Sequence, residues 1–132
     1  MSTQTTASVS THILDTSAGR PAAGVPVRLS ARSTDQGPWT ELGASATDAD
    51  GRCKDLPAPP EGTTRVRLEF GTEAYFLTRR AEAQQDVPAH RDSGPGPVFF
   101  PEVAIVFAVS AGEHYHVPLL LNPFGYSVYR GS

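Results

Sequence analysis

Arg65-Val-Arg-Leu-Glu-Phe70 alternates charged and apolar side chains, and this stretch decides the fold. Successive side chains of an extended chain point to opposite faces, so the three apolar side chains are expected to share a buried face. A strand with one buried and one solvated face is typical of antiparallel sheets. Val25-Pro-Val-Arg-Leu-Ser30 alternates in the same way and predicts a second strand, with Pro26, Arg28 and Ser30 on its solvated face.

Shorter apolar runs lie on both sides of these two strands, separated by frequent Gly and Pro, of which the chain has 12 each. Such punctuation is typical of proteins with many short strands. Further strands are expected at residues 9–15, 40–47, 52–56 and 126–131. Seven or eight short strands imply a mainly β protein, either a sandwich or a barrel.

One segment departs from the β pattern. Residues 72–83 are rich in helix formers and begin with Thr72, a suitable capping residue, so a short helix is expected there. The following residues, 84–97, contain three Pro and two Gly and almost no apolar side chain, which predicts an exposed connection.

The length of 132 residues suits one domain, to which we assign residues 9–132, with residues 1–8 as a flexible N-terminus. The 11 Lys and Arg against 14 Asp and Glu give a net charge of -3, which disfavours nucleic acid as a partner because phosphate binding needs clustered positive charge. No signal peptide or membrane span is recognisable. Cys53 is the only cysteine, so no intramolecular disulfide can form, and a cytoplasmic location is expected.

The C-terminal third has apolar residues on both faces of its expected strands. Val103-Ala-Ile-Val-Phe-Ala-Val109 and Val117-Pro-Leu-Leu-Leu121 show no alternation, although a two-layer sandwich buries only one face of each sheet. A second copy of the chain would cover the outer face, which predicts a homo-oligomer. The alternative is a thicker core covered by the helix and the connection after it.

Three histidines are candidates for chemistry. His12 lies within an expected strand, and His114 and His116 are two residues apart and would share a strand face with Pro118 and Leu120. A His-x-His pair can bind zinc, but no acid or cysteine is spaced to complete a site, so no metal is assigned. No Gly-x-Ser-x-Gly motif indicates a serine hydrolase, and Cys53 is interpreted as a packing residue although Arg52 precedes it.

The chain ends in Tyr129-Arg-Gly-Ser132, directly after an expected strand. These residues offer hydroxyl and guanidinium donors and a terminal carboxylate. Either they belong to a site, or they form a solvated tail, which is the usual fate of a chain terminus.

Two segments give the chain a specific resemblance to a known family. They are Ser10-Thr-His-Ile-Leu-Asp-Thr-Ser-Ala-Gly-Arg-Pro-Ala-Ala-Gly-Val-Pro-Val-Arg-Leu29 and His114-Tyr-His-Val-Pro-Leu-Leu-Leu-Asn-Pro-Phe-Gly-Tyr-Ser-Val-Tyr-Arg-Gly-Ser132. Together they resemble the signature segments of the 5-hydroxyisourate hydrolases, the transthyretin-related enzymes of urate breakdown. The closing Tyr-Arg-Gly-Ser is the element that distinguishes these enzymes from the transthyretin carriers.

The resemblance implies a transthyretin-like β-sandwich of two four-stranded sheets with one short helix, assembled as a homotetramer that is a dimer of dimers. It implies hydrolysis of the six-membered ring of 5-hydroxyisourate, giving 2-oxo-4-hydroxy-4-carboxy-5-ureidoimidazoline in purine catabolism, without a cofactor. The implied catalytic residues are His12, Arg52, His116 and Ser132, and the implied substrate-binding residues are His12, Arg52, Tyr129, Arg130 and Gly131. His114 is the adjacent, less essential histidine of that pattern.

The residue roles that the reaction needs are a general base, an electrophilic donor and a general acid. His12 and His116 can share the proton transfers, Arg52 suits the developing oxyanion, and Tyr129 and Ser132 would orient substrate and water. Which histidine is the base stays open, as does covalent attack by Ser132. The alternative functions are a carrier of a small ligand and a structural β-sandwich.

Overall fold

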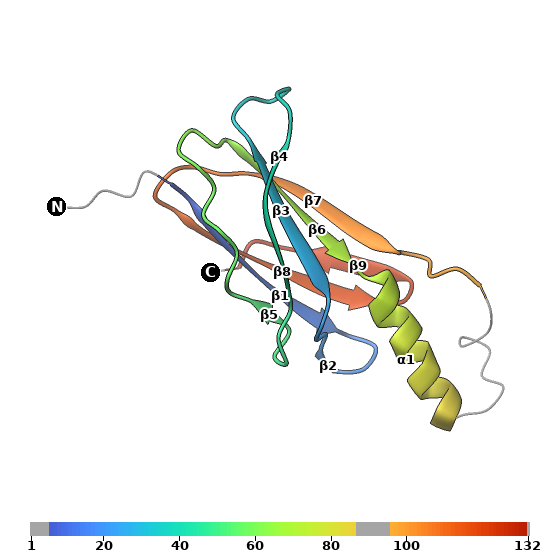
Figure 1. Ribbon diagram of the computed structural model, residues 1–132. Helices are drawn as coiled ribbons and strands as arrows, with labels where there is room; N and C mark the ends of the chain where they lie inside the picture. The colour runs from blue at the N-terminus through green and yellow to red at the C-terminus, as the bar shows by residue number, and fades with distance from the viewer. Residues whose placement is uncertain (1–5, 87–95, 132) are drawn as a thin grey trace.

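Two β-sheets packed face to face, with a helix beside them, form the part of the chain that the computed structural model describes, residues 6–86 and 96–131 (Figure 1). This confirms the predicted β-sandwich with one helix. The first sheet runs in the order β2-β1-β8-β9, with β5 also pairing with β1, and the second runs β4-β3-β6-β7. The elements are β1 (Ser8–Asp15), β2 (Arg20–Pro21), β3 (Pro26–Arg32), β4 (Thr40–Ala46), β5 (Arg52–Cys53), β6 (Arg65–Gly71), α1 (Glu73–Asp86), β7 (Glu102–Ala108), β8 (His114–Asn122) and β9 (Gly125–Val128).

The first sheet has five strands where four were expected. β1 pairs along its whole length with β8, in parallel, so its other edge is available to both two-residue strands. β5 pairs with β1 at Thr11 and His12, and β2 pairs at Leu14 and Asp15. The expected strand at residues 52–56 is therefore shorter than predicted, but it holds Arg52 against the middle of β1.

Strand alternation fills the core as predicted. Val66, Leu68 and Phe70 of β6 are fully buried, and they face the side chains that β1 and β8 bury from the other sheet. Burying a side chain of this size contributes about 1.5–3 kcal/mol relative to leaving it exposed. The buried residues of the opposite sheet include Val9, Ile13, Tyr115, Val117, Leu119 and Leu121.

Three features of the fold differ from the sequence predictions: the burial of one residue and two boundaries. Ser30 is buried, not solvated. β3 keeps a regular register with β6 here, with Ser30 opposite Arg67, so Ser30 is buried on the outer face of the sheet; the register shift between Leu29 and Ser30 places the extra residue in β4. The helix continues to Asp86, so residues 84–86 are helical, and the expected connection at residues 87–95 lies outside the described residues. Ala7 is buried and β1 begins at Ser8, so residues 6–8 belong to the folded part and the described chain does not support flexibility there.

Thr72 directly precedes α1, as predicted, but its hydroxyl does not cap the helix. The Thr72 carbonyl accepts the first helical hydrogen bond, from the Phe76 N–H, at 3.1 Å. The Thr72 hydroxyl instead donates to the Phe100 carbonyl at 2.6 Å. Thr72 therefore ties the start of the helix to the segment that leads into β7.

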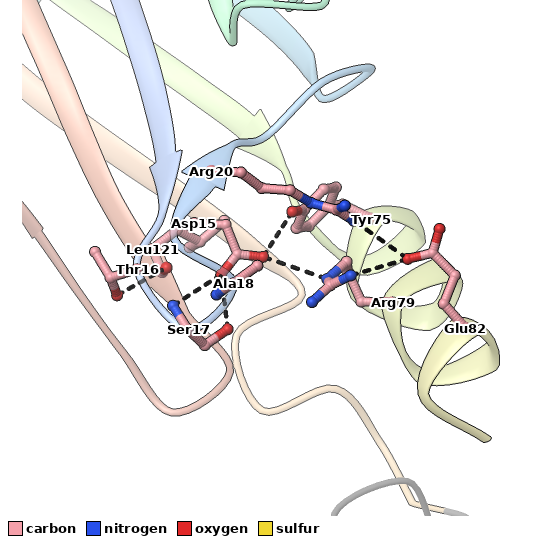
Figure 2. Close-up of polar contacts among 9 residues, drawn as sticks. All are labelled: Asp15, Thr16, Ser17, Ala18, Arg20, Tyr75, Arg79, Glu82 and Leu121. Atoms are coloured by element: carbon pink, nitrogen blue, oxygen red, sulfur yellow. Dashed lines mark hydrogen bonds and ion pairs between the residues drawn. The ribbon is translucent and has the colours of Figure 1, made fainter. Parts of the chain in front are cut away.

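Asp15, at the end of β1, joins the first sheet to α1 (Figure 2). Its carboxylate accepts hydrogen bonds from the Tyr75 hydroxyl at 2.6 Å and from Ser17 and Ala18 in the turn that follows β1. Arg79 lies 3.5 Å from the same carboxylate. Burial alone would raise the pKa of Asp15, but these hydrogen bonds outweigh it and lower the pKa below its usual value of 3.8. The charged group therefore anchors the end of the strand that carries His12.

The outer face of β7 is not covered within the described chain. Ala104, Val106 and Ala108 point away from the core, and Val106 is 52% exposed. Within the described residues α1 leaves this strand face open, whereas residues 87–95 of the connection, the other part of the alternative cover, lie outside them.

Candidate active site

The polar side chains of β1 and β8 gather on the outer face of the first sheet. In the parallel register Ser8 lies opposite His114, Ser10 opposite His116, and His12 opposite Pro118. Alternation sends Tyr115 and Val117 into the core, so His114 and His116 point outward, as predicted. The same sheet therefore supplies a core on one face and a row of imidazole and hydroxyl groups on the other.

A tight turn brings Arg52 to His12. The Asp48 carboxylate accepts the N–H groups of Asp50 and Arg52, at 2.9 and 3.0 Å, and holds the turn that leads into β5. Gly51 has φ +76° and packs so closely on the Ile13 carbonyl that a side chain there would collide with it. Arg52 then pairs with His12 across the β1–β5 ladder, which places the two predicted site residues side by side.

This turn also fixes the tautomer of the His12 ring. His12 Nε2 lies 2.9 Å from the Asp50 carbonyl oxygen. A carbonyl only accepts, so Nε2 carries a proton, and in the neutral ring Nδ1 is then the unprotonated nitrogen. His12 can accept a proton at Nδ1 while the Asp50 carbonyl holds the other side of the ring.

His116 lies at a shallow hollow of about 320 Å³ on this outer face. Burial, together with the neighbouring charges of His12, Arg52 and His114, lowers the pKa of His116. The hollow is lined by Ser10, Thr11, Arg52, Lys54, His114 and His116. The lowered pKa favours the neutral form of His116 beside Arg52.

The C-terminal segment reaches this site through Gly131. The Gly131 N–H donates to the His116 carbonyl at 2.7 Å, and an added Cβ at Gly131 would lie 3.0 Å from His116 Cδ2. Tyr129 and Arg130 lie elsewhere, along a second hollow beside β7. Arg130 stacks 4.4 Å from the centre of the Tyr115 ring and lies 3.3 Å from Glu113. Ser132, expected to be catalytic, lies outside the described residues.

The structure thus brings together His12, Arg52, His114, His116 and Gly131. Within one chain it leaves Tyr129 and Arg130 apart from the two histidines. Sequence reasoning missed Ser10, whose hydroxyl touches two imidazoles, and Lys54 at the rim. Strand alternation places Ser10 on the face of His12, but its meeting with His116 depends on the register of two distant strands.

A larger hollow of about 530 Å³ lies beside α1 but offers no comparable chemistry. Its charged side chains are engaged with one another, because Arg79 lies 2.9 Å and Arg20 3.4 Å from Glu82 (Figure 2). Cys53 is fully buried, and burial raises the pKa of its thiol, which fits a packing residue.

Within residues 6–86 and 96–131, no three His, Cys, Asp or Glu side chains cluster in a way that could hold a metal ion. In the same part of the chain no helix is long and apolar enough to cross a membrane.

Known proteins are similar to this chain over nearly its whole length. The model of the HIUase/Transthyretin family matches residues 9–131. A 5-hydroxyisourate hydrolase of Salmonella dublin is 41% identical over 126 residues, covering 94% of this chain and 80% of that protein.

Two solved structures agree with this match. The 5-hydroxyisourate hydrolase of Klebsiella pneumoniae aligns with a TM-score of 0.69 at 35% identity, over 96% of this chain and 99% of the other. Transthyretin from Sparus aurata aligns with a TM-score of 0.71 at 29% identity, over 93% of this chain and 95% of the other. The fold, the outward histidines and these matches lead to one conclusion: the chain belongs to the HIUase/Transthyretin family.

Proposed function

We propose that this protein is a hydrolase that opens the six-membered ring of 5-hydroxyisourate, a step of urate degradation. The observation that carries the proposal is the pairing of His12 with Arg52 across β1 and β5, beside His116 on the same sheet face. Relatives that are 41% and 35% identical over most of their length are 5-hydroxyisourate hydrolases.

In the proposed reaction water attacks the ring amide carbonyl carbon. The bond from that carbon to the ring nitrogen then breaks, the nitrogen takes a proton, and the carbon ends as a carboxylate. The step needs a base for the water, a donor for the oxyanion and an acid for the nitrogen. The product carboxylic acid ionises, so one proton is released to solvent for each ring opened.

We assign the base to His12. Its Nδ1 is the unprotonated nitrogen, and the Asp50 carbonyl at 2.9 Å stabilises the imidazolium that forms when Nδ1 takes the proton of water. Arg52, next to it, keeps its charge at all working pH values and offers a planar set of donors to the oxyanion.

We assign the acid to His116. Its Nδ1 is engaged by Ser10 at 2.9 Å, so Nε2 is the nitrogen available to the substrate. The terminal residues Tyr129, Arg130, Gly131 and Ser132 are proposed to complete substrate binding, with Ser132 orienting water. No cofactor or metal is assigned a part in this mechanism.

The proposed assembly is a homotetramer in the cytoplasm. The open apolar face of β7, with Val106 52% exposed, supports association of copies of the chain. Light scattering coupled to size exclusion tests it, and a monomer at micromolar concentration would contradict it.

The test of the function follows the ultraviolet absorbance of freshly prepared 5-hydroxyisourate, with and without the protein. Acceleration of its decay supports the hydrolase. A carrier of a small ligand, as an alternative, would bind the compound without accelerating its decay. Activity should also survive exhaustive chelation, and its loss on chelation with recovery on adding zinc would show that a metal takes part.

A further inference from the structure

Four side chains form a continuous hydrogen-bonded chain along the outer face of β1 and β8. Ser8 Oγ lies 2.7 Å from His114 Nδ1, Ser10 Oγ lies 3.0 Å from His114 Nε2, and Ser10 Oγ lies 2.9 Å from His116 Nδ1. Residues on the two strands contribute alternately, because the parallel register sets Ser8 beside His114 and Ser10 beside His116. The chain runs from the exposed start of the strands to the candidate acid.

The hydrogen bonds in this chain have to share one direction. Ser10 has one hydroxyl proton, so it donates to only one of its two imidazole partners and the other partner must donate to it. A neutral His114 likewise donates from one ring nitrogen and accepts at the other. If Ser8 donates to His114, then His114 donates to Ser10, Ser10 donates to His116 Nδ1, and His116 carries its proton on Nε2.

We propose, on the basis of the function proposed above, that Ser8, His114 and Ser10 form a proton relay that keeps His116 neutral, by protonating its Nδ1 as its Nε2 gives a proton to the leaving nitrogen. When His116 gives up its Nε2 proton, its ring would become an imidazolate anion unless Nδ1 receives a proton. The Ser10 hydroxyl supplies that proton to Nδ1, His114 Nε2–H replaces it on Ser10, and Ser8 replaces the proton of His114 at Nδ1. Ser8 in turn takes a proton from solvent, so the balance is one proton taken up and one delivered.

The relay returns to its starting direction when the protons shift back along the same hydrogen bonds. His116 Nε2 takes a proton from water, its Nδ1 proton passes to Ser10, Ser10 returns a proton to His114 Nε2, and His114 Nδ1 returns one to Ser8, which releases one proton to solvent. No oxidant, metal or other reactant is involved. The burial that lowers the pKa of His116 makes a long-lived imidazolium unfavourable, which is why stepwise replacement along a hydrogen-bonded chain suits this residue.

Ser10 and His114 thus have a positioning and relay role, since both act through His116. The relay also gives the His-x-His pair a role that needs no metal, because serine hydroxyls engage both ring nitrogens of His114. Among the described residues, Ser10 is the one side chain that hydrogen-bonds to both imidazoles of β8.

The kinetic test compares Ser10→Ala with Ser10→Thr, which keeps the hydroxyl and suits a strand. In dilute buffer Ser10→Ala should lower kcat at least about tenfold, less than the about 10²–10⁴-fold typical of removing the acid itself. KM should stay within about twofold, because substrate binding is not the step affected. Added imidazole buffer should restore kcat by delivering protons directly, and Ser10→Thr should resemble the unchanged protein.

Loss of kcat in Ser10→Ala that no buffer restores would overturn the relay and leave Ser10 a purely structural role. An unchanged kcat in dilute buffer would overturn it as well.

A second measurement needs no substrate. The ¹⁵N shifts of the ring nitrogens should show complementary tautomers for His114 and His116 that change together in Ser10→Ala and persist in Ser10→Thr. Independent tautomers would refute the coupled chain. Coupled tautomers in a protein that does not accelerate the decay of 5-hydroxyisourate would refute the proposed function, and with it the relay. Independent tautomers in a protein that does accelerate the decay would refute the relay alone.

Discussion

Gly131→Ala tests whether the C-terminal segment sets the position of His116. Gly131 donates its N–H to the His116 carbonyl at 2.7 Å. An added Cβ would stand 3.0 Å from His116 Cδ2 and 3.4 Å from the His116 carbonyl oxygen, where ordinary contacts begin at 3.4 Å. The ring has to give way by about 0.4 Å, since the hydrogen bond to the His116 carbonyl holds the Gly131 backbone against β8 in an isolated bridge.

The size of the effect follows from that displacement. Misplacement of a reacting group by about 1 Å costs on the order of 10²-fold in rate, so about 0.4 Å should lower kcat roughly fivefold to tenfold. Thermal stability should change little, because the residue lies at the end of the chain and the substitution removes no buried group. The measurement is the initial rate of 5-hydroxyisourate decay over a range of substrate concentrations, with the melting temperature recorded in parallel.

Gly125→Ala is the matched control in the same part of the chain. A Cβ there meets only the Asn122 side chain, at 3.7 Å, which is an ordinary contact. It should therefore leave kcat unchanged. A folded, assembled Gly131→Ala protein with the unchanged kcat would refute the argument that this close approach positions His116.

Alanine at any of three proposed catalytic residues should lower turnover by about 10²–10⁴-fold, whereas His114→Ala should cost about tenfold and His90→Ala, outside the described residues, far less. The three variants are His12→Ala, Arg52→Ala and His116→Ala, and full activity in a folded His116→Ala would reject its role. Deleting residues 130–132, or fusing a tag after Ser132, should abolish most turnover with little loss of thermal stability, while a tag before Ser2 should be harmless; equal activity of the two tagged proteins would exclude the terminus from the site. Tyr75→Phe should destabilise the fold by about 1–3 kcal/mol at pH 7, since it removes a hydrogen bond to the buried Asp15 carboxylate. The pKa of Asp15 is lowered on folding, so its stabilising effect is complete above about 3.8 and is lost as the pH falls through the folded value. Burial and the contact with Asp15 raise the pKa of Tyr75 to about 12, so its effect is present below pH 10 and is lost as the pH rises toward 12. Denaturation curves of both proteins at pH 3, 7 and 11 decide this, and equal stability at pH 7 would contradict it.

The sequence predicted those features that depend on local pattern. β6 follows its alternation residue by residue, because both of its neighbours pair with it in regular antiparallel register. The prediction for Ser30 was wrong although the alternation of β3 holds, because Ser30 lies opposite Arg67 on the outer face and the burial of that face depends on neighbouring segments. The helix was predicted too short, since Gln84 and Gln85 were grouped with the Pro-rich segment after them although both are good helix formers.

The site was predictable residue by residue but not as an arrangement. Alternation gave the outward faces of His12, His114 and His116, and the resemblance gave their roles. The contact of His12 with Arg52 depends on a two-residue strand, and the contact of Ser10 with His116 depends on pairing between residues 106 positions apart. Serine on a strand face carries no signal of its own, so the relay could be found only in the structure.

The precision of this site derives from the core behind it. On β8 the residues that alternate with His114 and His116 are Tyr115 and Val117, which are buried against the second sheet. A slip of one residue between β1 and β8 would turn these apolar groups outward and bury the imidazoles without partners, at a cost of several kcal/mol. The hydrophobic core therefore fixes the register, and the register sets the hydroxyl of Ser10 between two histidines. Substitutions that loosen the core under β8, such as Leu119→Ala, should for this reason impair turnover before the protein unfolds.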